Sequence, residues 1–212
     1  MHPSATSTWP ERVRCVLCLS AAALLLAIVA TVALIAAKTF DPKPFGRLLR
    51  IDQPGTFEQS EVGERVIALD APWSAGSPPE RFTVRLRAAQ AGGDPDSGYG
   101  LVLGDGDNRL VVAASPLGYV AVREEKRDGQ PVYLTPWSTW PHIRPGEEAN
   151  EIWLNGARNG GRATITALVN REYLWQGDVA WPPDRADLWL VAFSEPVAVE
   201  FRSLEWFAGP DD

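Results

Sequence analysis

The sequence predicts an all-β fold, an antiparallel sandwich or barrel, preceded by a single transmembrane helix. Two observations carry this prediction. Short segments with strand patterning follow one another at close intervals, separated by turn-forming residues. An uncharged apolar run precedes them. We divide the 212 residues into a short polar tail (1–14), a transmembrane helix (15–37), a linker (38–47) and a β domain (48–212).

The apolar run extends from Cys15 to Ala37 and contains no charged residue. As a helix it spans roughly 34 Å, enough to cross a hydrocarbon core of about 30 Å. A cleaved signal peptide is the main alternative, but its apolar core is usually shorter, and Ile35-Ala36-Ala37 matches the A-x-A cleavage pattern poorly. We therefore expect an uncleaved, single-pass anchor formed by residues 15–37.

The orientation of the anchor rests on conflicting signals. Basic residues are more numerous after the run (Lys38, Lys43, Arg47, Arg50) than before it (Arg12, Arg14), which alone would keep the domain inside. Long domains translocate largely regardless of flanking charge, and a short polar N-terminal tail is typical of a signal-anchor. We therefore expect the domain to be extracytoplasmic.

The cysteine content and the charge exclude several functions. Cys15 and Cys18 are the only cysteines, so the domain has no thiol nucleophile, cysteine-based zinc site or disulfide. Residues 38–212, which follow the apolar run, contain 18 basic and 26 acidic residues and therefore carry a net charge of −8. An acidic surface argues against a nucleic-acid partner and against docking on anionic lipid.

The strand predictions begin with Arg81–Ala88, in which apolar and polar residues alternate. In the segment 195–207 the apolar set changes parity between Phe201 and Leu204, which predicts a bulge near Arg202-Ser203. The other predicted strands are 99–104, 109–115, 118–124, 131–137, 150–158, 162–170, 171–177 and 185–193.

From about Arg81 to Phe207 the chain resembles concanavalin A-like, laminin-G-type jelly rolls. The resemblance lies in the order of several pieces, among them YGLVLGDGDNRLVVAAS, GYVAVREEKRDGQ and RADLWLVAFSEPVAVEFRSLEWF. It implies an all-β, antiparallel two-sheet jelly-roll sandwich with one curved sheet. Relatives hold glycans or proteins on the concave face or rim, and some are glycanases, so the fold alone does not predict the function.

No arrangement of residues indicates catalysis. A glycosidase needs two carboxylates facing each other across the sugar, and no strand shows such a pair at alternate positions. His142 is the only histidine in the domain, and no nucleophile motif accompanies it. We therefore predict no enzyme activity, with a glycan hydrolase of the same fold as the alternative.

The stretch LGDGDNRLV (103–111) offers hard oxygen ligands from Asp105, Asp107 and Asn108 for a Ca²⁺ ion. The same residues favour a tight hairpin turn, and no EF-hand spacing is present. We favour the turn and expect no cofactor. A calcium site would need a further ligand, for which the neighbouring acidic loop offers Asp94 or Asp96.

The aromatic residues are the strongest positive signal, because the apolar faces of sugar rings stack on aromatic rings. Seven of the nine Trp lie between Trp137 and Trp206. We assign Trp153, Trp189 and Trp206 to core packing, since strand aliphatics flank them. The candidate ligand-binding residues lie in a proline-rich loop or at the polar parity of strands: Trp137, Trp140, Tyr119, Tyr173 and Trp175.

Together these features predict a membrane-anchored, extracytoplasmic, non-catalytic module that binds a glycan or an envelope protein. A structural accessory subunit of a cell-envelope assembly is a further alternative. Carboxylates 5–10 Å apart on the concave face would favour the hydrolase, and an exposed Trp/Tyr platform there would favour glycan binding.

Overall fold

The computed structural model describes residues 11–37, 39, 41–70, 72–73, 79–104, 107–127, 129–181 and 183–209. The chain forms two compact units, Met1–Pro42 and Lys43–Asp212. The second unit therefore begins within the predicted linker.

The described part of the first unit contains one helix, α1 (Glu11–Ala36). Its segment Cys15–Ala36 is long and apolar enough to cross a membrane, and none of it is buried inside the protein. A signal sequence near the N-terminus would share these properties. The structure thus confirms one apolar N-terminal helix.

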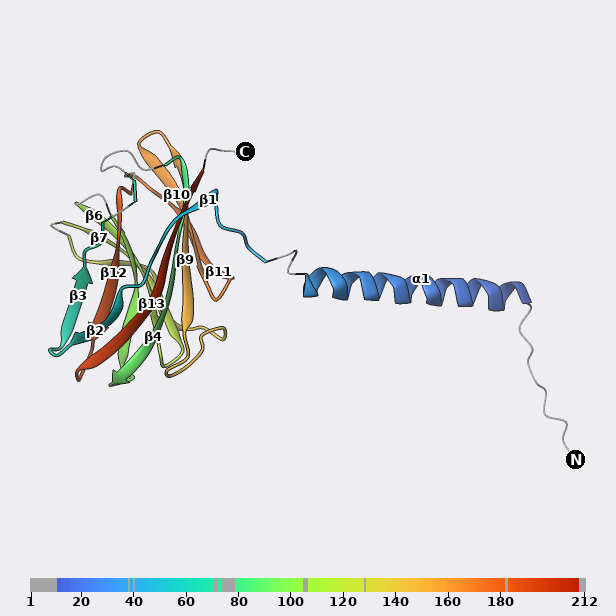
Figure 1. Ribbon diagram of the computed structural model, residues 1–212, viewed down its shortest axis with the longest axis horizontal. Helices are drawn as coiled ribbons and strands as arrows, with labels where there is room; N and C mark the ends of the chain where they lie inside the picture. The colour runs from blue at the N-terminus through green and yellow to red at the C-terminus, as the bar shows by residue number, and fades with distance from the viewer. Residues whose placement is uncertain are drawn as a thin grey trace, which may run out of the picture. The chain divides into compact units, whose positions relative to one another are not determined.

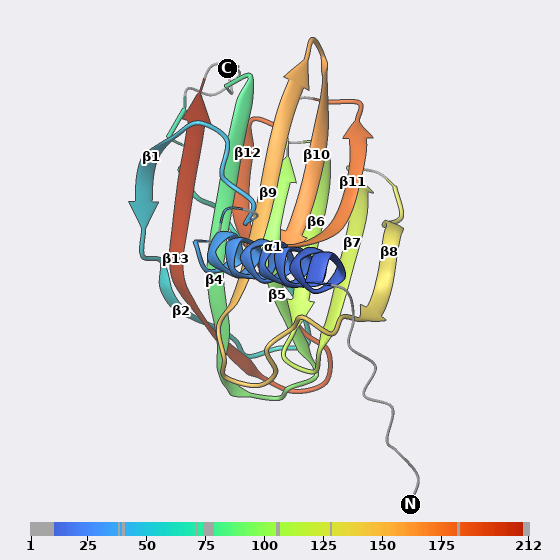
Figure 2. The same ribbon diagram turned by 90° about the vertical axis from the view of Figure 1, so that its right-hand side faces the viewer.

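The second unit is a sandwich of two antiparallel sheets (Figures 1 and 2), as the sequence predicts. One sheet has the order β1-β13-β4-β9-β10-β11, with β2 also paired to β13, and the other has the order β3-β12-β5-β6-β7-β8. The strands of the first sheet are β1 (Arg47–Asp52), β2 (Gly55–Gln59), β4 (Arg81–Gly93), β9 (Asn150–Asn159), β10 (Arg162–Val169), β11 (Glu172–Val179) and β13 (Val197–Gly209). Those of the second are β3 (Gly63–Ile67), β5 (Ser97–Gly104), β6 (Asn108–Ser115), β7 (Tyr119–Lys126), β8 (Val132–Thr139) and β12 (Arg185–Ala192).

The core lies between the two sheets and is built by alternate residues of each strand. On β4, for example, Phe82, Val84 and Leu86 are completely buried in it, and Trp206 of β13 joins them. The pairing of β13 with β4 shifts register between Phe201 and Ser203. This confirms the bulge predicted at Arg202-Ser203, which keeps Phe201, Leu204 and Trp206 all in the core.

The six-stranded sheet is strongly curved, and its outer face is concave. Strands β3 and β7 are four strand spacings apart in this sheet, or roughly 19 Å if the sheet were flat. Even so, Arg123 of β7 donates a hydrogen bond to Glu64 of β3 over 2.7 Å. Trp137 of β8 and Phe193, just after β12, are as many strands apart, and their ring centroids lie 5.8 Å apart. Only a sheet that bends its edges toward each other over its outer face allows both contacts.

Three strands at the start of the domain, β1, β2 and β3, were not predicted. All three lie at sheet edges or pair with one neighbour only, and most of their residues are exposed or half-buried. They show no clean alternation of apolar and polar residues, and this alternation is the signal of a half-buried strand.

Candidate functional site

The concave face carries its own apolar cluster, separate from the core between the sheets. Val102, Val111, Ala113, Trp189 and Val191 are all at most 3% exposed and pack together there, with Trp137 against them. The sequence prediction that Trp153, Trp189 and Trp206 are buried is confirmed. Only Trp206 belongs to the core between the sheets, however, and Trp189 belongs to the cluster on the concave face.

An ion-pair network covers part of this cluster. The buried guanidinium of Arg123 lies over the Trp189 ring, 5.1 Å from its centroid, and contacts both Glu64 and Glu125. The Trp189 indole Nε1 donates a hydrogen bond of 3.2 Å to Glu64. Burial by itself would lower the pKa of Arg123, but Glu64, Glu125 and a hydrogen bond with Tyr133 together raise it above its ordinary value. The guanidinium thus remains charged and ties β3 to β7 across the face.

An aromatic cavity of about 410 Å³ opens at one end of the concave face. Three aromatic rings, those of Tyr119, Trp137 and Phe193, and the side chain of Leu117 give it a mainly apolar wall. Asp96 and Ser115 contribute the polar part of its lining. A mainly apolar cavity with a few polar groups is the usual form of a small-molecule binding site.

Strand parity and two turns place these side chains in the cavity. In β7, Tyr119 alternates with the core residue Val120 and therefore faces the concave side. The β6–β7 turn is closed by a hydrogen bond of 3.0 Å from the Gly118 amide to the Ser115 carbonyl. The Phe193 amide donates a hydrogen bond of 3.3 Å to the Asp96 carbonyl. This bond joins the Phe193 side of the cavity to the β4–β5 turn.

Gly98 of β5 makes room for the Trp137 indole. A Cβ at this position would lie 3.0 Å from Trp137 Cη2, 3.1 Å from Val191 and 3.2 Å from Trp189. These distances are shorter than ordinary van der Waals contact, so a larger residue would displace the rings. The glycine thus allows the Trp137 ring to pack against the apolar cluster of the concave face.

The β4–β5 turn that supplies Asp96 is fixed by its neighbour Asp94. The Ser194 hydroxyl donates a hydrogen bond to the Asp94 carboxylate, and the Asp96 amide donates another over 2.9 Å. These bonds, the one from Ser194 first, lower the pKa of Asp94 below its ordinary value. The turn is therefore held in place next to the cavity at neutral pH.

The structure brings together two of the five predicted ligand-binding residues, Tyr119 and Trp137. Trp140 packs partly against the core, and its indole Nε1 is buried without a hydrogen-bond partner. Tyr173 lies in the other sheet, where it pairs with Leu168 and is 58% exposed. The three residues Trp140, Tyr173 and Trp175 are therefore outside the lining of the aromatic cavity.

The predicted parity of Trp175 is wrong. Trp175 pairs with Ala167, a core residue of β10, and itself packs against the core. The register of β11 against β10 shifts next to this pair, between Ala167 and Leu168. A count of alternate positions from the sequence does not reveal such a shift.

Four lining residues of the aromatic cavity were not predicted as such from the sequence: Phe193, Leu117, Ser115 and Asp96. Phe193 follows β12 at the parity of Trp189 and Val191, so its alternation indicated the concave face. Leu117 and Asp96 lie in turns, and only the three-dimensional structure shows that these turns meet at one end of the sheet.

The stretch 103–111 contains the end of β5 and the start of β6, which pair as a hairpin with Gly104 opposite Arg109. The Asp107 carboxylate forms an ion pair of 2.6 Å with Arg127, and Asn108 begins β6. Asp105 lies outside the described residues. Within the part of the chain that the structure describes, no group of three or more His, Cys, Asp or Glu side chains is placed to hold a metal ion.

Asp94 and Asp96 do not lie near this turn, contrary to the sequence-based expectation. They precede β5, whereas Asp107 follows its end, and the eight residues of the strand separate them. Because a strand rises about 3.3 Å per residue, the two acidic loops are more than roughly 20 Å apart.

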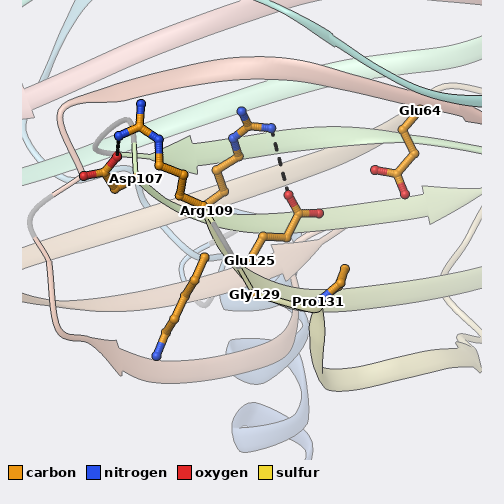
Figure 3. A pocket seen from close by; sticks show the side chains of 8 residues that line it. Glu64, Asp107, Arg109, Glu125, Gly129 and Pro131 are labelled. Carbon is orange, nitrogen blue, oxygen red and sulfur yellow. Dashed lines mark ion pairs between the residues drawn. The ribbon is translucent and has the colours of Figure 1, made fainter.

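A second, charged cavity of about 450 Å³ lies at the other end of the concave face (Figure 3). Its lining includes Glu64, Arg109 and Glu125, together with Asp107 and Arg127 from the adjoining turns. The Arg109 guanidinium is 4.0 Å from Glu125. In the view of Figure 3, Glu125 lies between Asp107 on the left and Glu64 on the right.

No protein-family model and no curated protein sequence matches the chain. Similar solved structures include the carbohydrate-binding module CBM66 from Bacillus subtilis, with 12% identity, 78% of this chain and 98% of that chain covered, and a TM-score of 0.48. Sheep galectin-11 has 12% identity, 70% and 98% coverage and a TM-score of 0.42. The CBM40 domain of a Ruminococcus gnavus sialidase, bound to α2,6 sialyllactose, has 11% identity, 78% and 95% coverage and a TM-score of 0.43. These similarities are too low to indicate a family or a ligand for this chain.

Proposed function

We propose that the domain is a non-catalytic recognition module that binds a neutral saccharide in the aromatic cavity of its concave face. The observation that carries this proposal is the meeting of Tyr119, Trp137 and Phe193 around one cavity. Sugar rings present apolar C–H faces that stack on aromatic rings, and their hydroxyl groups need a few polar partners. The Asp96 carboxylate accepts hydrogen bonds and the Ser115 hydroxyl both donates and accepts them, so the lining offers both.

The lining also favours a neutral ligand over an anionic one. Asp96 is the only charged residue that lines the described part of this cavity. A carboxylate on the ligand would meet the Asp96 carboxylate and find no cation in the lining, and like charges in proximity repel.

We propose that the domain is not catalytic because of the position of the Arg123 side chain. Glu64 and Glu125 both contact Nη2 of Arg123, so the carboxylates approach the separation of about 5–5.5 Å that retaining glycosidases use. Between them, however, the guanidinium fills the space that a glycosidic bond would have to occupy. The pair therefore serves to bridge β3 and β7 and leaves no room for hydrolysis.

Two further parts of the proposal concern ancestry and location. We infer that the domain is a distant concanavalin A-like jelly roll, on the resemblance in the order of its sequence segments. We also infer that α1 is an uncleaved anchor that holds the domain on the extracytoplasmic side of a membrane. A structural accessory role in an envelope assembly is the alternative, and it predicts no saccharide binding.

The test is binding of the full chain, purified in detergent micelles, to an array of neutral oligosaccharides. We expect the wild type to bind and Trp137→Ala to lose binding at least tenfold, because the largest stacking ring is removed. Tyr173→Ala is the matched control, since it removes an exposed aromatic residue from the opposite sheet. Circular dichroism and thermal melting establish that each variant is folded.

Absence of wild-type binding across the array would refute the proposal and favour the structural role. Equal loss in Trp137→Ala and Tyr173→Ala would also contradict it, because it would place the binding surface elsewhere.

A further inference from the structure

The two cavities of the concave face lie along the same two strands. In β7, Tyr119 lines the aromatic cavity and Glu125 lines the charged one, six residues further on. In β6, Ser115 and Arg109 are related in the same way. Since side chains on one face recur every second residue, all four point to the concave side. A separation of six residues corresponds to roughly 20 Å.

Every carboxylate that lines the charged cavity has a cationic partner. Arg123 contacts Glu64 and Glu125, Arg109 approaches Glu125, and Arg127 pairs with Asp107. Lys126 lines the cavity too, so the lining holds three carboxylates and three cations and has little net charge to attract an ion of either sign. It remains dense in hydrogen-bonding groups, because carboxylates accept and guanidinium groups donate.

Two of these groups retain free capacity toward the cavity. The Arg109 side chain is 49% exposed, and its ion pair with Glu125 is as long as 4.0 Å. The Glu64 side chain is 42% exposed although it is bonded to Arg123. A polyhydroxylated neutral molecule can satisfy such exposed donors and acceptors together, whereas an isolated ion would meet equal attraction and repulsion.

The edge strand β8 connects the two cavities with aromatic side chains. Tyr133 pairs with Arg123 in the middle of β7 and is 46% exposed. Trp137, four residues on, lines the aromatic cavity. A ligand that extends from one cavity to the other would thus pass along a further ring.

We propose that the charged cavity is a second saccharide subsite, and that the two cavities together bind one linear, neutral oligosaccharide. Its middle units pass over the exposed Tyr133 ring of β8, outside the bridge that Arg123 forms with Glu64. This inference rests on the proposed function, because the aromatic cavity supplies the first contact. It adds that the physiological ligand is a chain of several sugars, one end of which is stacked on rings and the other hydrogen-bonded to Arg109 and Glu64.

The experiment measures affinity against chain length. The probes are homologous series of β1,4-linked glucose, xylose, mannose and N-acetylglucosamine oligomers of two to eight units, titrated into the full chain in detergent micelles. For any series that binds, we expect affinity to rise at least tenfold from the dimer to the longer oligomers. Arg109→Ala should lower the affinity for the longer oligomers about tenfold, which removes most of this rise, and should leave the affinity for the dimer unchanged.

Arg162→Ala is the matched control, because it removes an exposed cation from the β9–β10 hairpin of the other sheet. It should leave both the dimer and the longer oligomers unaffected. Arg109 itself is exposed, and its long ion pair contributes little to stability, so the variant is expected to fold.

The outcomes separate the two proposals. Dimers that bind as tightly as octamers, or a rise with length that survives Arg109→Ala, would overturn the second subsite and leave the aromatic cavity standing. No wild-type binding to any series would overturn both.

Discussion

At the scale of single residues, the same side-chain type serves different purposes according to where its strand places it. Trp206 fills the core between the sheets, Trp189 lies buried on the concave face, and Trp137 lines a cavity there. Trp140, only three residues from Trp137, is turned toward the core. The hydrogen bond from the Trp140 amide to the Gly118 carbonyl, 2.9 Å long, fixes this divergence just after the end of β8.

Tyr99 gives the first stability prediction at this scale. It is completely buried, and its hydroxyl accepts a hydrogen bond of 2.8 Å from Asn150. Burial raises the pKa of Tyr99 to about 12, although the bond from Asn150 opposes the shift. Since the pKa of an unfolded tyrosine is about 10, this group's contribution to stability is complete below pH 10. It is lost as pH rises from 10 to 12, by roughly 2–3 kcal/mol.

The measurement compares the unfolding free energy of the wild type with that of Tyr99→Phe between pH 8 and 12. At pH 8 the variant should be less stable by about 1 kcal/mol, the usual contribution of one buried hydrogen bond. At pH 12 the order should reverse, because phenylalanine has no proton to lose. Tyr119→Phe, which changes a half-exposed residue, is the control. A difference between wild type and Tyr99→Phe that does not change with pH would contradict the prediction.

At the scale of elements, one extra residue in β13 determines which side chains of the strand face the core. The bulge at Arg202 lets Val197, Val199 and Phe201 share the core with Leu204 and Trp206, although the two groups differ in parity. Without the extra residue, one of the groups would turn outward.

Deleting Arg202 should therefore be far more damaging than replacing it. The deletion forces Leu204 and Trp206 out of the core or shifts the pairing with β4, and each buried side chain of this kind contributes about 1.5–3 kcal/mol. We expect the deletion variant to be unfolded or insoluble. Arg202→Ala keeps the bulge and removes only an exposed ion pair with Glu200, which is worth at most about 1 kcal/mol. Thermal melts that show comparable stability for the two variants would refute the role of the bulge.

The sequence predicted the strands from β4 to β13 because each shows alternation or a turn signal that is local. It predicted the bulge in β13 for the same reason. Strands β1, β2 and β3 were missed because edge strands with exposed faces carry little alternation. The site was only half predicted, because contacts such as Arg123 with Glu64 and Trp137 with Phe193 depend on strand order and curvature, which are not local properties.

At the scale of the whole molecule, the chain combines an apolar helix with an acidic β domain, and the two form separate compact units. The full chain carries a net charge of −7, which disfavours adsorption to the phosphates of nucleic acid. The function of α1, however, decides whether the concave face is displayed at a membrane or released with a free domain.

The anchor can be tested directly in cells that express the full chain. We expect the protein to stay in the membrane pellet after alkaline carbonate extraction and to have the mass of an uncleaved chain, because Cys15–Ala36 spans roughly 33 Å as a helix. Replacing Leu25 and Val29 together by Arg should release it, since each arginine at the centre of a span costs about 2.5–3.5 kcal/mol. Exchange of the same two residues for Ala keeps the segment apolar and is the matched control. A soluble product with the mass of a chain that begins at Lys38 would instead identify the segment as a cleaved signal peptide.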